Sequence, residues 1–404
     1  MEIIEGGVCA AKGFAANGVH CGIRKNKSKK DLALIYSEVP ANAAAVYTTN
    51  LVKGAPLAVT KRHLAKNGTA RAVICNSGNA NTCNAGGEEL AEETSALLAK
   101  ELGIAADEVV VASTGVIGLP MSIEPFKVGI PELVHGLGDH GDFAAEGILT
   151  TDTIKKEAAV SFFVGGKECR LGGIAKGSGM IRPNMATMLV FLTTDCAVTT
   201  PMLQKALSGD VQNTFNMVSI DGDTSTNDMV VLLANGMAGN RTIDAEGEDF
   251  SIFMKALNTV TVCLCKMLAG DGEGVSKLLE CQVSGAKNAD SAKKAAKAVI
   301  CSSLVKTAMF GADANWGRVL CAIGYSGADV DIGKVNVSFR SPKGMVLLCE
   351  NGAGVPFSEE KAKEILLEKE IEILLGFGDG DASATAWGCD LTYEYVRING
   401  DYRT

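Results

Sequence analysis

Apolar residues recur at helical spacing in several stretches of the chain. Between residues 88 and 102 they return every three or four positions and form one face of a helix, and Gly103 stands where glycine commonly ends one. The same pattern predicts a helix that reaches Leu149 and helices over residues 201–207, 250–268, 289–306 and 358–374.

Short apolar runs, many of them rich in β-branched residues, predict strands between these helices. They cover residues 31–39, 43–47, 72–75, 109–111, 158–164, 169–171, 188–192, 229–234, 335–339 and 345–349. Residues 76–81, Asn-Ser-Gly-Asn-Ala-Asn, predict a polar turn after one of these strands. Because strands and helices are interspersed along the chain, the sequence predicts an α/β (α+β) fold.

Length and charge narrow the class of protein. A chain of 404 residues can bury a large core, in two domains or in one elaborate domain. The net charge of −9 argues against a nucleic-acid partner, and so does the aromatic content of 5%. The N-terminus does not pair a charged stretch with an apolar one, and no apolar run approaches the roughly 18 residues that span a bilayer. We therefore expect a cytoplasmic protein with no nucleic-acid and no membrane partner.

Cysteine, histidine and glycine patterns argue against several common sites. The 13 cysteines include no C-x-x-C pair and are expected to be reduced core thiols. The four histidines lack zinc-hydrolase spacing, and no G-x-S-x-G elbow accompanies them. Residues 221–232 begin like a calcium loop, but Thr226 and Leu232 replace the required glycine and glutamate. The glycines at 376–380 do not match a dinucleotide motif, so we expect no metal and no cofactor.

Thr187 stands between a flexible loop sequence and a buried strand. Residues 176–184 contain two glycines, one proline and two cations, whereas residues 188–192 are all apolar. A hydroxyl at this junction would be held rigidly and still be reachable by a substrate. If the bond between Ala186 and Thr187 were cleaved, the new α-amine, with a pKa of about 8, could act as the base for its own Oγ. The simpler interpretation is a strand edge on which Thr187 fills a half-buried slot.

Three short sequence motifs in this region resemble the signature of the ornithine acetyltransferase (ArgJ) family, the glutamate N-acetyltransferases of arginine biosynthesis. They are Lys176-Gly-Ser-Gly-Met180, Asn184-Met-Ala-Thr-Met-Leu189 and Leu192-Thr-Thr-Asp195. Further motifs that resemble this family occur from the Gly6-Gly7 region to the C-terminal Asn399-Gly-Asp-Tyr-Arg-Thr404. The resemblance implies that the chain cleaves itself after Ala186 and that Thr187 becomes the nucleophile.

The remaining site residues combine local signals with this resemblance. Thr114 and Gly115 follow a β-branched run, where a hydroxyl and a backbone N–H could form an oxyanion hole, although such pairs are common in turns. Glu273 lies among glycines and could meet a substrate ammonium group, or belong to a solvated acidic loop. The resemblance implies that Thr114 and Gly115 form the oxyanion hole. It also implies a set of substrate-binding residues, Thr150, Lys176, Thr187, Glu273, Asn399 and Thr404.

The resemblance further implies a fold, an activity and partners. The fold would be a layered α/β/β/α sandwich of the self-cleaving N-terminal-nucleophile type. In it an α chain (1–186) and a β chain (187–404) build one catalytic core, with a smaller C-terminal region at about 285–404. The enzyme would transfer the acetyl group of N2-acetyl-L-ornithine to L-glutamate through an acetyl-Thr187 intermediate, as a heterotetramer of two α and two β chains. Whether acetyl-CoA is also a donor stays open. The alternatives are an N-terminal-nucleophile aminopeptidase of the same fold and a non-catalytic amino-acid-binding protein.

Overall fold

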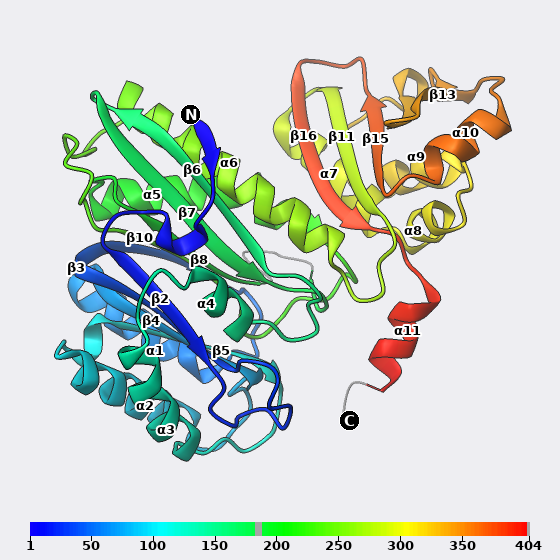
Figure 1. Cartoon of the computed structure of the whole chain (residues 1–404). Helices are drawn as coiled ribbons and strands as arrows, with labels where there is room; N and C mark the ends of the chain where they lie inside the picture. Colours follow the sequence, from blue (N-terminus) through cyan, green and yellow to red (C-terminus); the bar gives the residue numbers. More distant parts are fainter. Residues whose placement is uncertain (182–187, 402–404) are drawn as a thin grey trace. The chain divides into compact units, whose positions relative to one another are not determined.

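The computed structural model describes residues 1–181 and 188–401, and the chain divides into two compact units (Figure 1). Unit 1 consists of Met1–Gly177, Asn184–Gln212 and Thr224–Leu264. Unit 2 consists of Ser178–Pro183, Asn213–Asp223 and Cys265–Thr404. Each unit is built around its own sheet, and helices and strands are interspersed in both. The predicted mixed α/β class is therefore confirmed.

Unit 1 contains a nine-stranded sheet with the order β1-β6-β7-β8-β10-β3-β4-β5, and β2 pairs with β3. Its strands are β1 (Glu2–Ile4), β2 (Phe14–Val19), β3 (Leu32–Tyr47), β4 (Thr69–Asn79), β5 (Val109–Val116), β6 (Lys156–Val164), β7 (Lys167–Lys176), β8 (Leu189–Thr194) and β10 (Met229–Ala234). Its helices are α1 (Ala55–Asn67), α2 (Gly87–Leu102), α3 (Glu124–His135), α4 (Gly141–Gly147), α5 (Thr200–Val211) and the larger part of α6 (Glu248–Gly270). Short 3-10 helices cover Gly7–Cys9 and Ala106–Glu108.

Strand β3 divides the sheet of unit 1 into two layers. It is 16 residues long, and its pairing with β4 shifts register between Tyr36 and Ala41. Its first half pairs with β2 and β4, and residues 42–47 pair with β10. One layer therefore contains β4 and β5, while the other contains β7, β8 and β10.

The two layers pack face to face and are covered by helices on the outside. Val73 of β4 belongs to the same buried cluster as Ile174 of β7 and Phe191 of β8. The opposite face of β4 and β5 packs on α1, α2 and α3 through a second buried cluster. On the other side, the rings of Phe162 in β6 and Phe253 in α6 have their centres 6.3 Å apart. This order of layers agrees with the α/β/β/α sandwich that the resemblance implies.

Unit 2 contains a seven-stranded sheet with the order β14-β13-β12-β15-β11-β16-β9. Its strands are β9 (Val218–Ser219), β11 (Leu278–Ala286), β12 (Asn336–Ser341), β13 (Gly344–Glu350), β14 (Ala353–Gly354), β15 (Glu370–Gly376) and β16 (Ala382–Cys389). Its helices are α7 (Ala289–Cys301), α8 (Ser303–Phe310), α9 (Trp316–Gly324), α10 (Glu359–Leu366) and α11 (Tyr393–Gly400), with 3-10 helices at Phe215–Met217 and Ile332–Lys334. Helix α7 packs on β11 and β16.

Periodicity predicted the most regular elements correctly. The helix expected over residues 88–102 is α2, and Gly103 follows it with a φ of 67°. The apolar runs at 188–192 and 229–234 are the buried strands β8 and β10. Both strands are buried along their whole length, which explains why their sequences are uniformly apolar.

Two predicted boundaries in unit 1 are wrong because strand pairing continues through polar residues. The strands predicted at residues 31–39 and 43–47 are one strand, β3, which begins at Leu32. Residues 76–79 are not a turn, because they extend β4 alongside residues 113–116 of β5. The Asn-Ser-Gly-Asn sequence is therefore the part of β4 that pairs with the end of β5, where Thr114 lies.

Two predicted helices in unit 2 are also wrong in extent. The helix expected over residues 289–306 is interrupted at Ser302, whose side chain accepts a hydrogen bond from the N–H of Val305 and so begins α8. The helix expected over residues 358–374 ends at Leu366. Residues 370–376 instead form β15, which lies between β11 and β12, and their burial alternates as in a strand. Strands β11 and β16 and helix α9 were not predicted.

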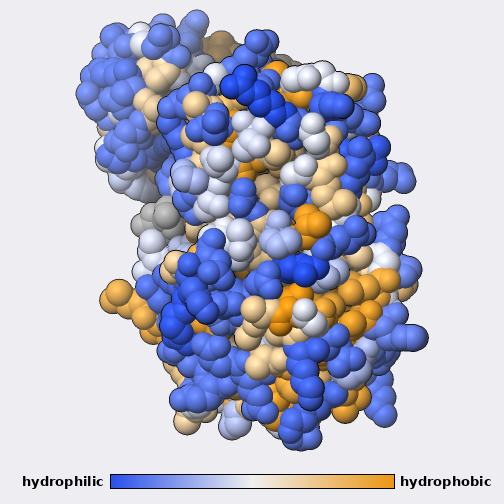
Figure 2. All heavy atoms as spheres, turned by 90° about the vertical axis from the view of Figure 1, so that its left-hand side faces the viewer, coloured by the Kyte–Doolittle hydropathy of each residue, from blue (hydrophilic) through white to orange (hydrophobic). Residues whose placement is uncertain are grey.

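Helix α6 also differs from the expectation that no apolar run is long enough to span a membrane. It has 23 residues, and an 18-residue stretch within it has a mean hydropathy of 1.5, so by length and composition alone it could cross a bilayer. Half of that stretch is buried inside the protein, and helices of protein cores share this length and apolar composition. On the face drawn in Figure 2, hydrophilic residues predominate and apolar residues gather in smaller areas.

Candidate active site

Thr114 and Gly115 lie near the end of β5, whose side chains alternate between the two cores of unit 1. Ala112 belongs to the cluster between the layers, and Val111 belongs to the cluster under the outer helices. Because successive side chains of a strand point to opposite faces, Thr114 points toward the space between the layers. The residue as a whole is 9% exposed.

Gly115 occupies a position that only glycine fits. Its φ is 134°, and a Cβ there would lie 2.3 Å from the carbonyl carbon of Gly78 in the neighbouring β4. Backbone atoms cannot rotate away from such a contact, so the close approach of the two strands depends on the missing side chain. Gly115 is predicted as a site residue from the sequence, but no local signal indicates this contact.

Asn227 fixes the strand that carries Thr114. Its amide nitrogen donates hydrogen bonds to the carbonyl oxygens of Ser113, at 2.9 Å, and Ala80, at 2.6 Å. Its amide oxygen accepts from two threonine hydroxyls, each at 2.6 Å. This buried amide therefore joins the start of β10 to the end of β5. Sequence reasoning described residues 219–228 only as a structured turn and missed Asn227.

Lys176 ends β7 on the inner side of its layer. It pairs with Leu189 of β8, and Leu189 belongs to the cluster between the layers. Lys176 is 8% exposed, and this burial lowers the pKa of its ammonium group. The carboxylates of Asp152 and Asp228 act in the opposite direction. Cys75 of β4 also interacts electrostatically with Lys176, so the lysine extends toward the other layer.

Asp152 connects Thr150 to the end of β7. One carboxylate oxygen accepts from the backbone N–H of Thr150 at 3.0 Å and from its hydroxyl at 3.4 Å. The other accepts from the ammonium of Lys156 and from the N–H of Gly177, both at 2.7 Å. Burial raises the pKa of Asp152, but the charges of Lys176 and Lys156, with these hydrogen bonds, hold it well below its usual value. Sequence reasoning named Thr150 and missed Asp152 two residues later.

Glu273 and Asn399 form a second group, which lies in unit 2. The Asn399 amide donates a hydrogen bond of 2.7 Å to the Glu273 carboxylate. Glu273 is 7% exposed, and its own N–H donates to the carbonyl oxygen of Ser178 at 2.9 Å. A Cβ on Gly179 would lie 2.6 Å from the Glu273 carboxylate, so glycine at this position leaves room for it. A carboxylate held in this way can receive an ammonium group.

Asp221 fixes the residues that follow Gly179 in the chain. Its carboxylate accepts hydrogen bonds from the backbone N–H groups of Met180, at 2.5 Å, and Ile181, at 2.8 Å. The hydroxyl of Tyr395 donates to it at 3.3 Å. Burial, followed by the negative charge of Asp221, raises the pKa of Tyr395, which keeps this hydroxyl a donor. The backbone is therefore held as far as Ile181, by a residue that sequence reasoning had tested only as a metal ligand.

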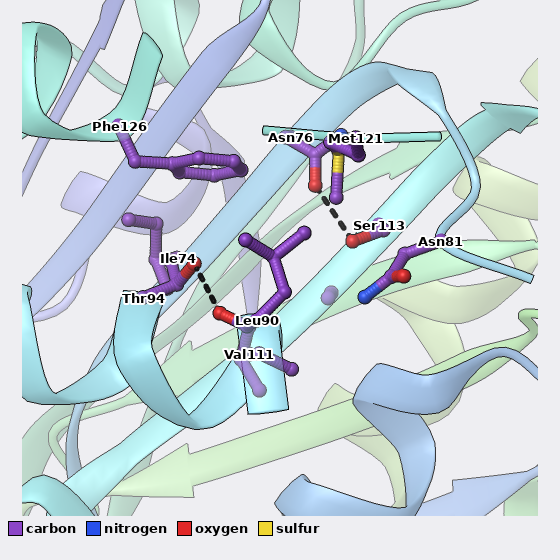
Figure 3. Close-up of a pocket in the computed structure, with 11 residues that line it drawn as sticks. Ile74, Asn76, Asn81, Leu90, Thr94, Val111, Ser113, Met121 and Phe126 are labelled. Carbon is purple, nitrogen blue, oxygen red and sulfur yellow. Dashed lines mark hydrogen bonds between the residues drawn. The ribbon is translucent and has the colours of Figure 1, made fainter. Parts of the chain in front are cut away.

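A small enclosed cavity lies behind the Thr114 strand, on its outer side (Figure 3). Asn76 and Ser113 line it, and the Ser113 hydroxyl donates a hydrogen bond of 2.6 Å to the Asn76 side chain. Its volume is about 10 Å³. A single buried water requires roughly 10–15 Å³, so this cavity is too small for an amino-acid substrate.

The predicted site residues that the structure describes are divided between the two units. Thr114, Thr150 and Lys176 lie in unit 1, and Glu273 and Asn399 lie in unit 2. The predicted residues Ala186, Thr187 and Thr404 lie outside the described residues. Among residues 1–181 and 188–401, no group of three or more His, Cys, Asp or Glu side chains is placed to hold a metal ion.

Comparison with known proteins gives a match over almost the whole chain. The model of the ArgJ family matches residues 15–404. The arginine biosynthesis bifunctional protein ArgJ of Caldanaerobacter subterraneus subsp. tengcongensis is 50% identical over 408 residues, covering 100% of both chains. ArgJ 1 of Clostridium acetobutylicum is 48% identical over 393 residues, covering 97% of this chain and 96% of that one. The crystal structure of argJ from Bacillus halodurans has 45% sequence identity and a TM-score of 0.50, and the match covers 52% of this chain and 97% of that chain. The chain therefore belongs to the ArgJ family.

Proposed function

We propose that this protein transfers the acetyl group of N2-acetyl-L-ornithine to L-glutamate and so produces L-ornithine and N-acetyl-L-glutamate in arginine biosynthesis. The observation that carries the proposal is the 50% identity, over the full length of both chains, to a relative named as an arginine biosynthesis bifunctional protein. Each unit contains a buried charge of a kind that binds one end of an amino acid: Lys176 in unit 1 can receive a carboxylate, and Glu273 in unit 2 can receive an ammonium group. The proposed enzyme is cytoplasmic and uses no metal or organic cofactor.

Thr187 is the nucleophile in the proposed mechanism. After cleavage of the Ala186–Thr187 bond, the free α-amine takes the proton of Oγ, which attacks the acetyl carbonyl carbon of N-acetylornithine. The hydroxyl of Thr114 and the N–H of Gly115 donate to the developing oxyanion, and one such donor is worth about 3–4 kcal/mol. The C–N bond then breaks, and ornithine leaves with the proton that the α-amine had taken. The neutral amine of glutamate attacks the carbonyl carbon of acetyl-Thr187, the C–Oγ bond breaks, and the proton lost by the glutamate nitrogen passes through the α-amine back to Oγ. Both steps conserve the acyl group, so the reaction needs no external oxidant or reductant.

The other residues bind the ends of the substrates. Lys176 holds a carboxylate, and Thr150 is positioned beside it through the Asp152 network. Glu273 receives the side-chain ammonium of ornithine, and Asn399 orients the Glu273 carboxylate. Thr404 completes the proposed set at the C-terminus. A buried ion pair between Lys176 and a substrate carboxylate is favourable because the ammonium group has already lost its water and gains a counter-charge when the substrate binds.

Maturation would divide the protein into an α chain, 1–186, and a β chain, 187–404, that remain in one catalytic core. In support, the match to the crystallised Bacillus halodurans protein covers 97% of that chain but only 52% of this one. That crystallised chain is thus roughly half as long as this chain, as self-cleavage near residue 187 would leave it. The assembly we propose is a heterotetramer of two α and two β chains. The word bifunctional in the names of the relatives is our reason to test acetyl-CoA as a second acetyl donor.

Intact mass spectrometry and single-turnover assays test this function. The purified protein should give two chains, and Thr187→Ala should give one chain without transferase activity. Incubation with N-acetylornithine alone should add one acetyl group to the chain that begins at Thr187 and release ornithine before glutamate is added. An active but uncleaved wild-type protein would contradict the proposal. Faster transfer to water than to glutamate would indicate the aminopeptidase alternative instead.

A further inference from the structure

Helix α11 is fixed to unit 2 by polar contacts and by close backbone packing. None of its eight residues, Tyr393–Gly400, is fully buried. Directly before the helix, the Thr392 hydroxyl donates a hydrogen bond of 2.6 Å to the carbonyl oxygen of Gly274. A Cβ on Gly274 would lie 2.6 Å from the Cβ of Glu394, so the first turn of the helix packs directly against this glycine. The start of α11 is therefore held by the loop that carries Glu273.

Two side chains on one face of α11 reach two different carboxylates. Tyr395 and Asn399 are four positions apart, so they are neighbours on the helix surface. The Tyr395 hydroxyl donates to Oδ2 of Asp221 at 3.3 Å, and the Asn399 amide donates to Oε2 of Glu273 at 2.7 Å. The same amide nitrogen donates to the backbone carbonyl of Tyr395 at 3.1 Å. The position of Asn399 therefore depends on the helical turn that Tyr395 anchors.

Both carboxylates contact the same short segment, residues 178–181. Asp221 accepts hydrogen bonds from two consecutive backbone N–H groups of this segment, at 2.5 and 2.8 Å. The N–H of Glu273 donates to the first carbonyl of the segment at 2.9 Å, and the Glu273 carboxylate lies against its second residue, a glycine. The contacts form a closed ring within unit 2, whose members are Tyr395, Asp221, residues 178–181, Glu273 and Asn399.

This ring restricts the direction of the Glu273 carboxylate. A free glutamate side chain has several rotatable bonds, and a binding group works well only when surrounding residues hold it close to its productive geometry. The hydrogen bond from Asn399 fixes one carboxylate oxygen of Glu273. The contact between Tyr395 and Asp221 fixes the helix from which Asn399 extends. Removal of the Tyr395 hydroxyl would therefore loosen Glu273 without changing its charge.

We propose that Tyr395 is a positioning residue that, through Asp221 and Asn399, holds the Glu273 carboxylate in the orientation that binds the side-chain ammonium group of ornithine. This inference rests on the proposed function, in which Glu273 receives that group. The role requires no contact between Tyr395 and the reacting atoms. Its consequence is selectivity, because the orientation of Glu273 matters for ligands with a charged side chain and not for uncharged ligands of the same length.

The test compares two acetyl donors in Tyr395→Phe, which removes only the hydroxyl. N-acetyl-L-norvaline has the same carbon chain as N-acetyl-L-ornithine but lacks the side-chain amine. We expect the KM for N-acetylornithine to rise by about three- to tenfold, the effect of one hydrogen bond of ordinary strength, while kcat is unchanged. The kcat/KM for N-acetylnorvaline and the KM for glutamate should stay at their wild-type values. A general structural defect would instead affect both donors.

Tyr393→Phe is the matched control. Tyr393 belongs to the same helix and is 84% exposed, and its ring packs edge-on against Phe310 with the ring centres 5.6 Å apart. Phenylalanine keeps this contact, so the variant should have wild-type constants for both donors. Thermal unfolding verifies that each variant is folded, and Tyr395→Leu replaces Tyr395→Phe if the latter does not fold.

A double-mutant cycle shows whether Tyr395 acts through Asn399. In the Asn399→Ala background the contact with Glu273 is already lost, so Tyr395→Phe should have little further effect on the KM for N-acetylornithine. Additive effects of the two substitutions would mean that Tyr395 acts by another route. Such additivity, or an equal loss with both donors, or no change in Tyr395→Phe would each overturn the proposed role.

The proposed function and the role of Tyr395 fail in distinguishable ways. If the wild-type protein transfers no acetyl group from N-acetylornithine to glutamate, the proposed function is wrong. The Kd values for L-ornithine and L-norvaline, measured by calorimetry in the same variants, then decide the role of Tyr395. If the wild type binds L-ornithine no more tightly than L-norvaline, Glu273 does not receive the ammonium group, and the role of Tyr395 is overturned.

Discussion

Replacing Gly115 with alanine tests whether the contact between β4 and β5 sets the geometry of the proposed oxyanion hole. The new Cβ would lie 2.3 Å from the carbonyl carbon of Gly78 and 2.5 Å from the nitrogen of Asn79. Ordinary van der Waals contacts begin near 3.4 Å. Both opposing atoms belong to the backbone, so no side chain can rotate to relieve the overlap. The ends of the two strands must separate by about 1 Å, the scale of displacement that matters for reacting groups.

The expected losses follow from that displacement. Overpacking of a tight contact costs about 1–3 kcal/mol, and a non-glycine residue at a φ of 134° adds about 1–3 kcal/mol of backbone strain. We therefore expect Gly115→Ala to lose about 2–6 kcal/mol of unfolding free energy, measured by urea denaturation. Because a 1 Å misplacement of positioned groups can reduce a rate by about 100-fold, acetyl transfer should decrease by about that factor.

Gly118→Ala is the control for backbone conformation alone. Gly118 also has a positive φ, 76°, but a Cβ there would meet no atom within 4 Å. It should lose only about 1–2 kcal/mol of stability, the cost of a left-handed conformation, and keep wild-type transfer activity. Equal stability and equal transfer rates in Gly115→Ala and Gly118→Ala would refute the reasoning, because the contact with Gly78 would then have no consequence.

Two further predictions concern the polar networks of the two units. Asp152→Asn breaks the buried ion pair between Asp152 and Lys156, so we expect a loss of about 3–5 kcal/mol in urea denaturation at pH 7. The pKa of Asp152 is lowered in the folded protein, so the ionised carboxylate stabilises the fold above the unfolded pKa of about 3.9, and this stabilisation disappears as the pH falls further. The unfolding free energies of wild type and Asp152→Asn should therefore converge in acid. Equal stability of the two proteins at pH 7 would contradict this. Asn399→Ala removes the hydrogen bond to Glu273, and charged hydrogen bonds contribute about 1.5–3 kcal/mol. We expect kcat/KM for N-acetylornithine to fall at least about tenfold while self-cleavage is retained, and unchanged transfer would remove Asn399 from the site.

Local pattern was sufficient for elements whose environment is uniform along their length. Helix α2 has one buried face and a terminal glycine, and β10 is buried on both faces, so periodicity and composition describe them directly. Pattern failed at β15, because it predicts that residues 370–374 end a helix. Their strand conformation depends on pairing with β11 and β12, which are distant in sequence. A short apolar segment does not contain the information that its pairing partners supply.

The sequence by itself determined the family and the types of residue available for the proposed chemistry, because short motifs such as Lys176-Gly-Ser-Gly-Met180 are contiguous in the chain. Only the tertiary structure decided which groups hold those residues in place. Asn227 bonds to the carbonyl of Ser113 across 114 positions, and Glu273 bonds to Asn399 across 126. Gly115 also approaches Gly78 of the neighbouring strand closely, which is possible only because Gly115 has no Cβ. These contacts could not be read from local sequence because their energy arises from desolvated groups that meet only when the chain is folded.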